Sequence, residues 1–131
     1  MPEKEKSFSF KARLHSFKYA FAGIVTFFRT QHNAIIHLFI ALIAVITGLW
    51  LSVSETQWLF IVIAIGMVFS AEIMNTAIEK IADMVTLEQN ETIKKIKDLS
   101  AAAVLVTAVT SAFIGLIIFI PPLLVKIGLL H

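Results

Sequence analysis

The chain has 131 residues, of which 58% are apolar and 15% charged, and its formal net charge is +2. This balance is far more apolar than that of an ordinary soluble domain and indicates a protein whose solvent is partly lipid. The absence of cysteine excludes disulfides, thiolate metal sites and cysteine nucleophiles. We expect a single domain over residues 1–131, because the scattered glycines and prolines mark no linker.

The first predicted element is an amphipathic helix over residues 7–30. Its apolar side chains recur every three or four positions, and basic side chains lie between them. This pattern is typical of a helix on a membrane surface, with its cations near anionic headgroups rather than nucleic acid. Packing against a soluble partner is the alternative interpretation. The segment lacks the apolar run and cleavage site of a secretory signal, so we expect it in the mature protein.

Three spanning helices are predicted next, over residues 34–52, 57–85 and 97–120. The uncharged run at 34–51 measures about 27 Å as a helix, close to the thickness of a bilayer core. A short polar turn between Trp50 and Trp58 predicts a tight helical hairpin. The second span continues without a helix breaker to residue 85, and we expect Pro121-Pro122 to interrupt the third. The fold class is therefore an all-α membrane protein with an N-terminal surface helix.

The basic residues predict the orientation of the chain. Ten of the eleven lysines and arginines lie before the first span or between the apolar parts of the second and third, and Lys126 is the exception. Because such residues concentrate in cytoplasmic segments, we expect a multi-pass protein of the bacterial inner membrane with its N-terminus in the cytoplasm and its C-terminus outside.

One face of the second predicted span carries polar side chains. Glu72, Asn75, Glu79 and Asp83 fall within an arc of about 80° on a helix. A carboxylate at the centre of a membrane helix costs about 2.5–3.5 kcal/mol, so a partner or a function is expected for it. Carboxylate and amide oxygens suit Mg²⁺, which takes its other ligands from water and phosphates. With the lysines at 94–97, they are the groups that phosphoryl transfer requires.

Other interpretations of these residues stay open. Glu79 and Asp83 also fit the solvated end of a long helix. Glu72 and Asn75 also fit hydrogen bonds between helices, or the pore of a non-catalytic oligomer. The sequence has no glycine-rich phosphate loop, so a nucleotide site would need a different construction.

The histidines do not indicate a zinc site. His32 and His37 are five residues apart, whereas two ligands on one helical face are three or four apart. We interpret both as polar positions near the lipid headgroups.

The central motif resembles a known family. Glu72-x-x-Asn75-Thr76-Ala77-Ile78-Glu79-x-x-x-Asp83, followed by Lys97-Asp98 and Ala101-Ala102-Ala103-Val104-Leu105, is similar to the signature of the small prokaryotic diacylglycerol kinases. That family includes undecaprenol kinases, and the stretches at 13–23 and 32–37 fit it too. The resemblance implies a homotrimer of three-span subunits that uses MgATP, with active sites shared between neighbours at the cytoplasmic boundary.

The resemblance also implies roles by position. Glu72 resembles the catalytic base that takes the proton of a lipid hydroxyl, and Glu79 resembles a metal ligand. Positions around nucleotide and substrate are matched by Asn75, Asp83, Lys97, Asp98 and Arg13. Gln31 stands where the family commonly has a second metal-binding glutamate, so we expect weaker metal binding there. The implied reaction is ATP-dependent phosphorylation of a lipid alcohol, with diacylglycerol the leading substrate and undecaprenol the second.

Overall fold

The computed structural model describes residues 9–86, 88 and 90–129, and these form four helices and no strand. Helix α1 (Phe10–Thr30) belongs to one compact unit of the chain. Helices α2 (His32–Leu51), α3 (Glu55–Val85) and α4 (Glu91–Lys126) form the second unit. Each of these three is long and apolar enough to cross a membrane. The predicted fold class, all-α with three spanning helices, is confirmed.

Helix α1 has large apolar side chains on its surface. Phe10, Leu14, Phe17 and Phe21 are all exposed. They are three or four residues apart, so they lie along one side of the helix. Taken by itself, α1 therefore has the amphipathic form that the sequence predicts.

Helices α2 and α3 are joined by a tight turn. Ser52 ends α2 in the left-handed region, with φ of 54°. Ser54 begins α3 with a capping box, in which its hydroxyl accepts from the Gln57 backbone N–H and its own N–H donates to the Gln57 side chain. A Cβ at Gly48 would lie 2.9 Å from the Trp58 indole, so a residue without a side chain lets the helices approach here.

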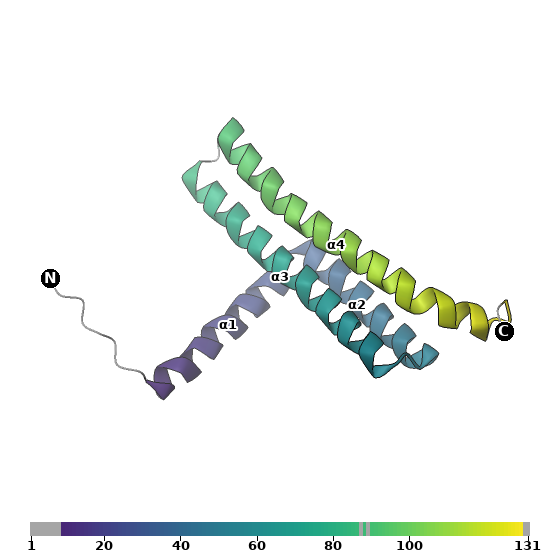
Figure 1. The fold of residues 1–131 in the computed structure, drawn as a ribbon. Coiled ribbons are helices and arrows are strands. Elements are labelled where there is room, and N and C mark those ends of the chain that lie inside the picture. Colours follow the sequence, from purple (N-terminus) through teal and green to yellow (C-terminus); the bar gives the residue numbers. More distant parts are fainter. Residues whose placement is uncertain (1–8, 87, 89, 130–131) are drawn as a thin grey trace. The chain divides into compact units, whose positions relative to one another are not determined.

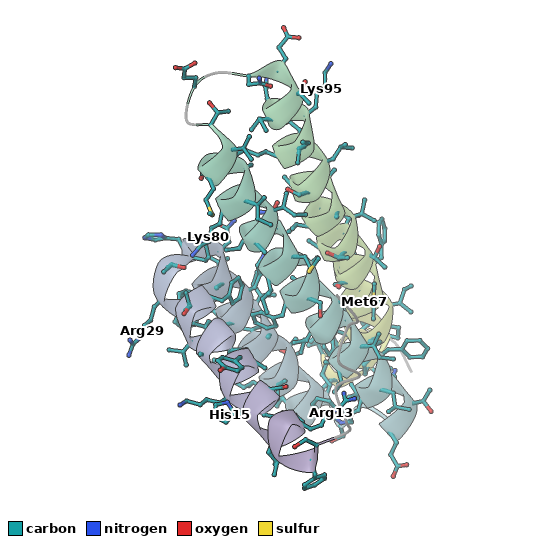
Figure 2. The ribbon with its side chains drawn as sticks, turned by 90° about the vertical axis from the view of Figure 1, so that its left-hand side faces the viewer. Arg13, His15, Arg29, Met67, Lys80 and Lys95 are labelled. Atoms are coloured by element: carbon teal, nitrogen blue, oxygen red, sulfur yellow. The ribbon has the colours of Figure 1, made fainter. Side chains whose placement is uncertain are left out.

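Helices α3 and α4 pack side by side along most of their length, and α2 lies beside one half of the pair (Figure 1). The Asn90 side chain caps α4 by accepting from the backbone N–H groups of Thr92 and Ile93 at 2.9 and 3.1 Å. At 1.5 Å per residue, α3 and α4 measure about 46 and 54 Å, more than the thickness of a bilayer core. In Figure 2, Lys95 and Lys80 lie toward the end where these two helices connect, and Met67 lies further along α3.

The third spanning helix is longer than expected at both ends. Helix α4 begins at Glu91 and continues through Pro121-Pro122 to Lys126, so the expected interruption at the prolines is wrong. The two prolines remove only the hydrogen bonds to the carbonyls four residues earlier, near the end of the helix, and the following turn still forms. An apolar run thus marks the part of a helix suited to lipid rather than its full length.

The turn between α2 and α3 is covered by an apolar cluster, here called the hairpin cluster. Its buried members are Leu51, Val53, Ile61 and Ile118, with Trp58, Ile65, Ile114, Phe119 and Leu123 packed against them. The end of α4 adds a polar tie, because Lys126 Nζ donates to the Trp50 carbonyl oxygen at 2.6 Å and lies 4.6 Å from the centre of the indole. This end of the bundle is held mainly by apolar contact.

Candidate active site on helix α3

The predicted polar stripe of α3 passes from a buried to an exposed environment. Glu72 is 3% exposed and Asn75 is 9% exposed, whereas Glu79 is half-buried and Asp83 is exposed. All four side chains belong to one uninterrupted helix, so their common face follows from its period of 3.6 residues. The stripe therefore joins the interior of the bundle to the polar end where α3 and α4 connect.

The buried carboxylate of Glu72 is paired with a histidine of α2. His37 Nε2 lies 2.9 Å from Glu72 Oε1, and the imidazole is one-fifth exposed. A deprotonated carboxylate can only accept hydrogen bonds, so Nε2 carries the hydrogen whenever Glu72 is ionised. The sequence analysis did not assign His37 to the site. Two signals were available: His37 belongs to the stretch at 32–37 that fits the family, and a carboxylate within a span requires a partner.

Asn75 links α3 to α4. Its Nδ2 donates to Glu79 Oε1 at 3.0 Å, and its Oδ1 accepts from the Ser100 hydroxyl at 2.6 Å. Ser100 is buried, and its Oγ also lies 2.9 Å from the Lys97 carbonyl oxygen. The amide orientation is fixed by these partners, because the Glu79 carboxylate needs a donor. Ser100 is a second site residue that the sequence analysis missed.

Asp83 and Lys97 meet at the exposed end of the stripe. Lys97 Nζ donates to Asp83 Oδ1 at 2.5 Å, and the two side chains are 38% and 52% exposed for lysine and aspartate. Water at such exposure screens the pair, so it adds little to stability. Both line a polar pocket of about 720 Å³, together with Glu88, Glu91 and Lys94 and neighbouring residues. Charges of both signs thus surround a space at the connection of α3 and α4.

The remaining predicted residues are Gln31, Asp98 and Arg13, and none of them makes a hydrogen bond to the stripe among the contacts described above. Gln31 is half-buried and precedes α2 without capping it. Asp98 is exposed on α4, and Arg13 is exposed on α1, in the other unit of the chain. Glu79 is one of the two expected metal ligands, and within the described ranges it belongs to no cluster of three or more histidine, aspartate or glutamate side chains.

The donor set around Glu79 nevertheless fits Mg²⁺. This ion commonly uses only one or two protein carboxylates and takes further oxygens from water and phosphate. The half-buried Glu79 carboxylate is held by one bond from Asn75, which leaves lone pairs for a cation.

An apolar pocket of about 290 Å³ lies between α2, α3 and α4. Small side chains leave this space, since its lining includes Ala41, Ala44, Ala64, Ala108, Ala112 and Gly115. His37 and Ser111 are its polar lining residues, and the Ser111 hydroxyl donates to the Ala64 carbonyl oxygen at 3.2 Å. His37 therefore borders both the apolar pocket and Glu72.

Comparison with known proteins gives a consistent result. The family model for prokaryotic diacylglycerol kinase matches residues 18–119, which include His37, the α3 stripe, Ser100 and Lys97 but not Arg13. An undecaprenol kinase of Bacillus subtilis (strain 168) is 41% identical over 108 residues, covering 82% of this chain and 88% of that protein.

Two diacylglycerol kinases are more distant. That of Synechocystis is 32% identical over 112 residues, 85% of this chain and 64% of that protein, and that of Escherichia coli (strain K12) is 31% identical over 70 residues, 53% and 57%. The chain thus spans less than two thirds of either diacylglycerol kinase. The extent of the family match nevertheless includes nearly all of the site described above. The chain therefore belongs to the prokaryotic diacylglycerol kinase family, a family of membrane lipid kinases that use ATP.

Proposed function

We propose that this protein transfers the γ-phosphoryl group of ATP to the hydroxyl of a membrane lipid at the cytoplasmic face of the inner membrane. The observation that carries the proposal is the buried Glu72, bonded to His37 and placed on the same helical face as residues of a charged pocket. A carboxylate at this depth in an apolar helix has a free-energy cost, and such residues are usually kept for a function.

Glu72 is the proposed general base. As the lipid oxygen forms a bond to the γ-phosphorus, Glu72 accepts the hydroxyl proton, and the bond to the β-phosphate oxygen breaks to release ADP. Because the carboxylate is almost fully enclosed, water competes little for that proton.

The polar end of the stripe is the proposed nucleotide site. Lys97 and Lys94 offer positive charge to the phosphates, and Asp83 holds Lys97 in place. Asn75, Asp98 and Arg13 are further proposed nucleotide or substrate residues, by resemblance to the family. Glu79 would hold Mg²⁺, which when bound neutralises developing charge on the phosphates. Asn75 orients the Glu79 carboxylate for this role.

A homotrimer is the proposed assembly, again by resemblance to the family. Many large apolar side chains of α2, α3 and α4 are exposed in the single chain, including Phe39, Leu59, Val106 and Ile117. Lipid or neighbouring subunits must cover these side chains.

The proposed acceptor is an isoprenoid alcohol of the undecaprenol type. Support comes from the undecaprenol kinase of Bacillus subtilis, which is 41% identical to this chain over a match that covers 88% of that protein. Diacylglycerol, favoured on the motif alone, is the second candidate, since the family model and the Synechocystis relative bear that name. The apolar pocket beside His37 is able to hold part of either chain.

The test is lipid phosphorylation by the purified protein in detergent with labelled ATP and Mg²⁺. We expect labelled lipid phosphate with undecaprenol and a lower kcat/KM with diacylglycerol. A higher kcat/KM for diacylglycerol would overturn the choice of acceptor and leave the kinase proposal standing. No labelled product with either alcohol would overturn the kinase proposal and favour a non-catalytic membrane oligomer.

Gln31 allows a separate test of metal binding. An added carboxylate strengthens the attraction for Mg²⁺, so Gln31→Glu should lower the Mg²⁺ concentration that gives half-maximal activity. Equal half-saturating concentrations in the two proteins would show that Gln31 does not contribute to the metal site.

A further inference from the structure

His37 occupies an unusual position for a polar side chain. It lies in the second turn of α2, where the flanking residues Ile36 and Leu38 are apolar and exposed, yet its own ring is turned inward to Glu72. Its side chain is 20% exposed, against 4% for the side chain of Glu72. A part-buried imidazole–carboxylate pair between two membrane helices holds both groups in a defined geometry.

The bond from His37 leaves one oxygen of Glu72 available. Oε1 is paired with Nε2, and within the described ranges Glu72 makes no other side-chain hydrogen bond. No side-chain oxygen in these ranges is both fully buried and unpaired, so Oε2 keeps a small exposed area although the carboxylate as a whole is nearly enclosed. Asn75 does not compete for Glu72, because its amide is engaged by Glu79 and Ser100.

His37 also forms one boundary of the apolar pocket, whereas Glu72 is not part of its lining. The imidazole therefore stands between the hydrocarbon space and the proposed base. An alcohol whose chain occupies the pocket and whose hydroxyl points toward the polar stripe meets His37 and Glu72 together.

We propose that His37 is a positioning residue for the phosphoryl transfer, an inference that rests on the proposed function. Its Nε2–H holds Oε1 of Glu72, so that Oε2 faces the hydroxyl of a lipid alcohol whose chain lies in the apolar pocket. Glu72 takes the proton and His37 exchanges none. Loss of this bond lets the carboxylate rotate, and a displacement of about 1 Å at a reacting group lowers the rate by up to about a hundredfold.

Two amide variants separate positioning from general structural support. The amide nitrogen of glutamine reaches the place of Nε2, whereas that of asparagine reaches only the place of Nδ1. His37→Gln should therefore keep kcat within about threefold of the wild type, and His37→Asn should lower kcat by about 10- to 100-fold. The KM for ATP should change less than twofold in both, since the nucleotide pocket lies at the far end of the stripe. His32→Gln, at an exposed position in the first turn of α2, is the matched control and should leave kcat unchanged.

A double-mutant cycle shows whether His37 acts through Glu72. Adding His37→Asn to Glu72→Gln should lower the residual activity less than twofold, because the base is already absent. A further drop of tenfold or more in the double variant, or equal kcat values for His37→Gln and His37→Asn, would overturn the positioning role. Full activity of Glu72→Gln alone would instead overturn Glu72 as the proposed base. Size-exclusion chromatography and circular dichroism on each variant identify those that fold. The comparison of His37→Gln with His37→Asn requires only that these two variants fold.

Discussion

The two ends of the α3–α4 pair differ in the kind of side chain that makes their contacts. At the turn between α2 and α3, the hairpin cluster packs apolar side chains and Gly48 lets Trp58 approach α2. At the other end, the contacts between helices include hydrogen bonds of polar side chains, such as that of Ser100 with Asn75. Buried polar pairs add little net stability compared with well-packed apolar groups. The difference suits a division of roles, in which the hairpin end stabilises the fold and the polar end carries the proposed chemistry.

The largest effect should come from Glu72→Gln, at the polar end. The amide retains the shape and can still accept from His37, but it cannot take up a proton, so lipid-dependent ATP turnover should fall by about 10²- to 10⁴-fold. Oligomeric state and helical content should not change. Glu55→Gln, at the exposed start of α3, is the control and should stay fully active. Wild-type turnover in Glu72→Gln would remove the distinction between the two ends.

Ile118→Ala tests the hairpin end. Ile118 is 5% exposed, so its truncation should leave a cavity and destabilise the fold by about 2–4 kcal/mol, while kcat measured well below the unfolding temperature should stay near wild type. Thermal unfolding followed by circular dichroism in detergent measures the first quantity. Ile117→Ala is the matched control: Ile117 is 72% exposed, so this variant should unfold near the wild-type temperature. Equal losses in the two variants would contradict a packing role for the cluster.

The smallest effect should come from Ser100→Ala, which removes the donor to Asn75 Oδ1. Asn75 then holds Glu79 less firmly, so kcat should fall by up to about tenfold, with a loss of stability of about 1 kcal/mol. The Mg²⁺ concentration for half-maximal activity should rise as well. Thr110→Ala, an exposed hydroxyl bonded within its own helix, is the control. An unchanged Mg²⁺ dependence in Ser100→Ala would show that the bond does not reach the metal position.

Relations within one helix could be predicted from the sequence. The period of the helix places Glu72, Asn75, Glu79 and Asp83 on one face without any knowledge of tertiary structure. The apolar runs likewise predict three spans, because the thickness of the bilayer fixes the length of an apolar run. The Asp83–Lys97 pair is not a relation of this kind, since its members lie on different helices.

Relations between helices could not be predicted. His37 and Glu72 are 35 residues apart, and the rotation of α2 against α3 decides whether they meet. The spacing of His32 and His37 tests only whether both could bind one metal ion from the same helix, and it says nothing about a partner on another helix. The length of α4 was missed for another reason: Asn90 caps it well before its apolar run, and the turn after Pro122 forms although the prolines lack two donors.

The unequal lengths of the helices have a consequence for the choice of host membrane. Helix α2 has 20 residues, about 30 Å, which just matches a bilayer core, whereas α3 and α4 with 31 and 36 residues exceed it. A bilayer whose core is thicker than the length of α2 is accommodated by local thinning of the lipid or by a change in helix tilt. The shortest helix bears that adjustment, and it is the helix that carries His37. Acyl-chain length in reconstituted vesicles is thus expected to tune the contact between α2 and Glu72 while the longer pair stays in register.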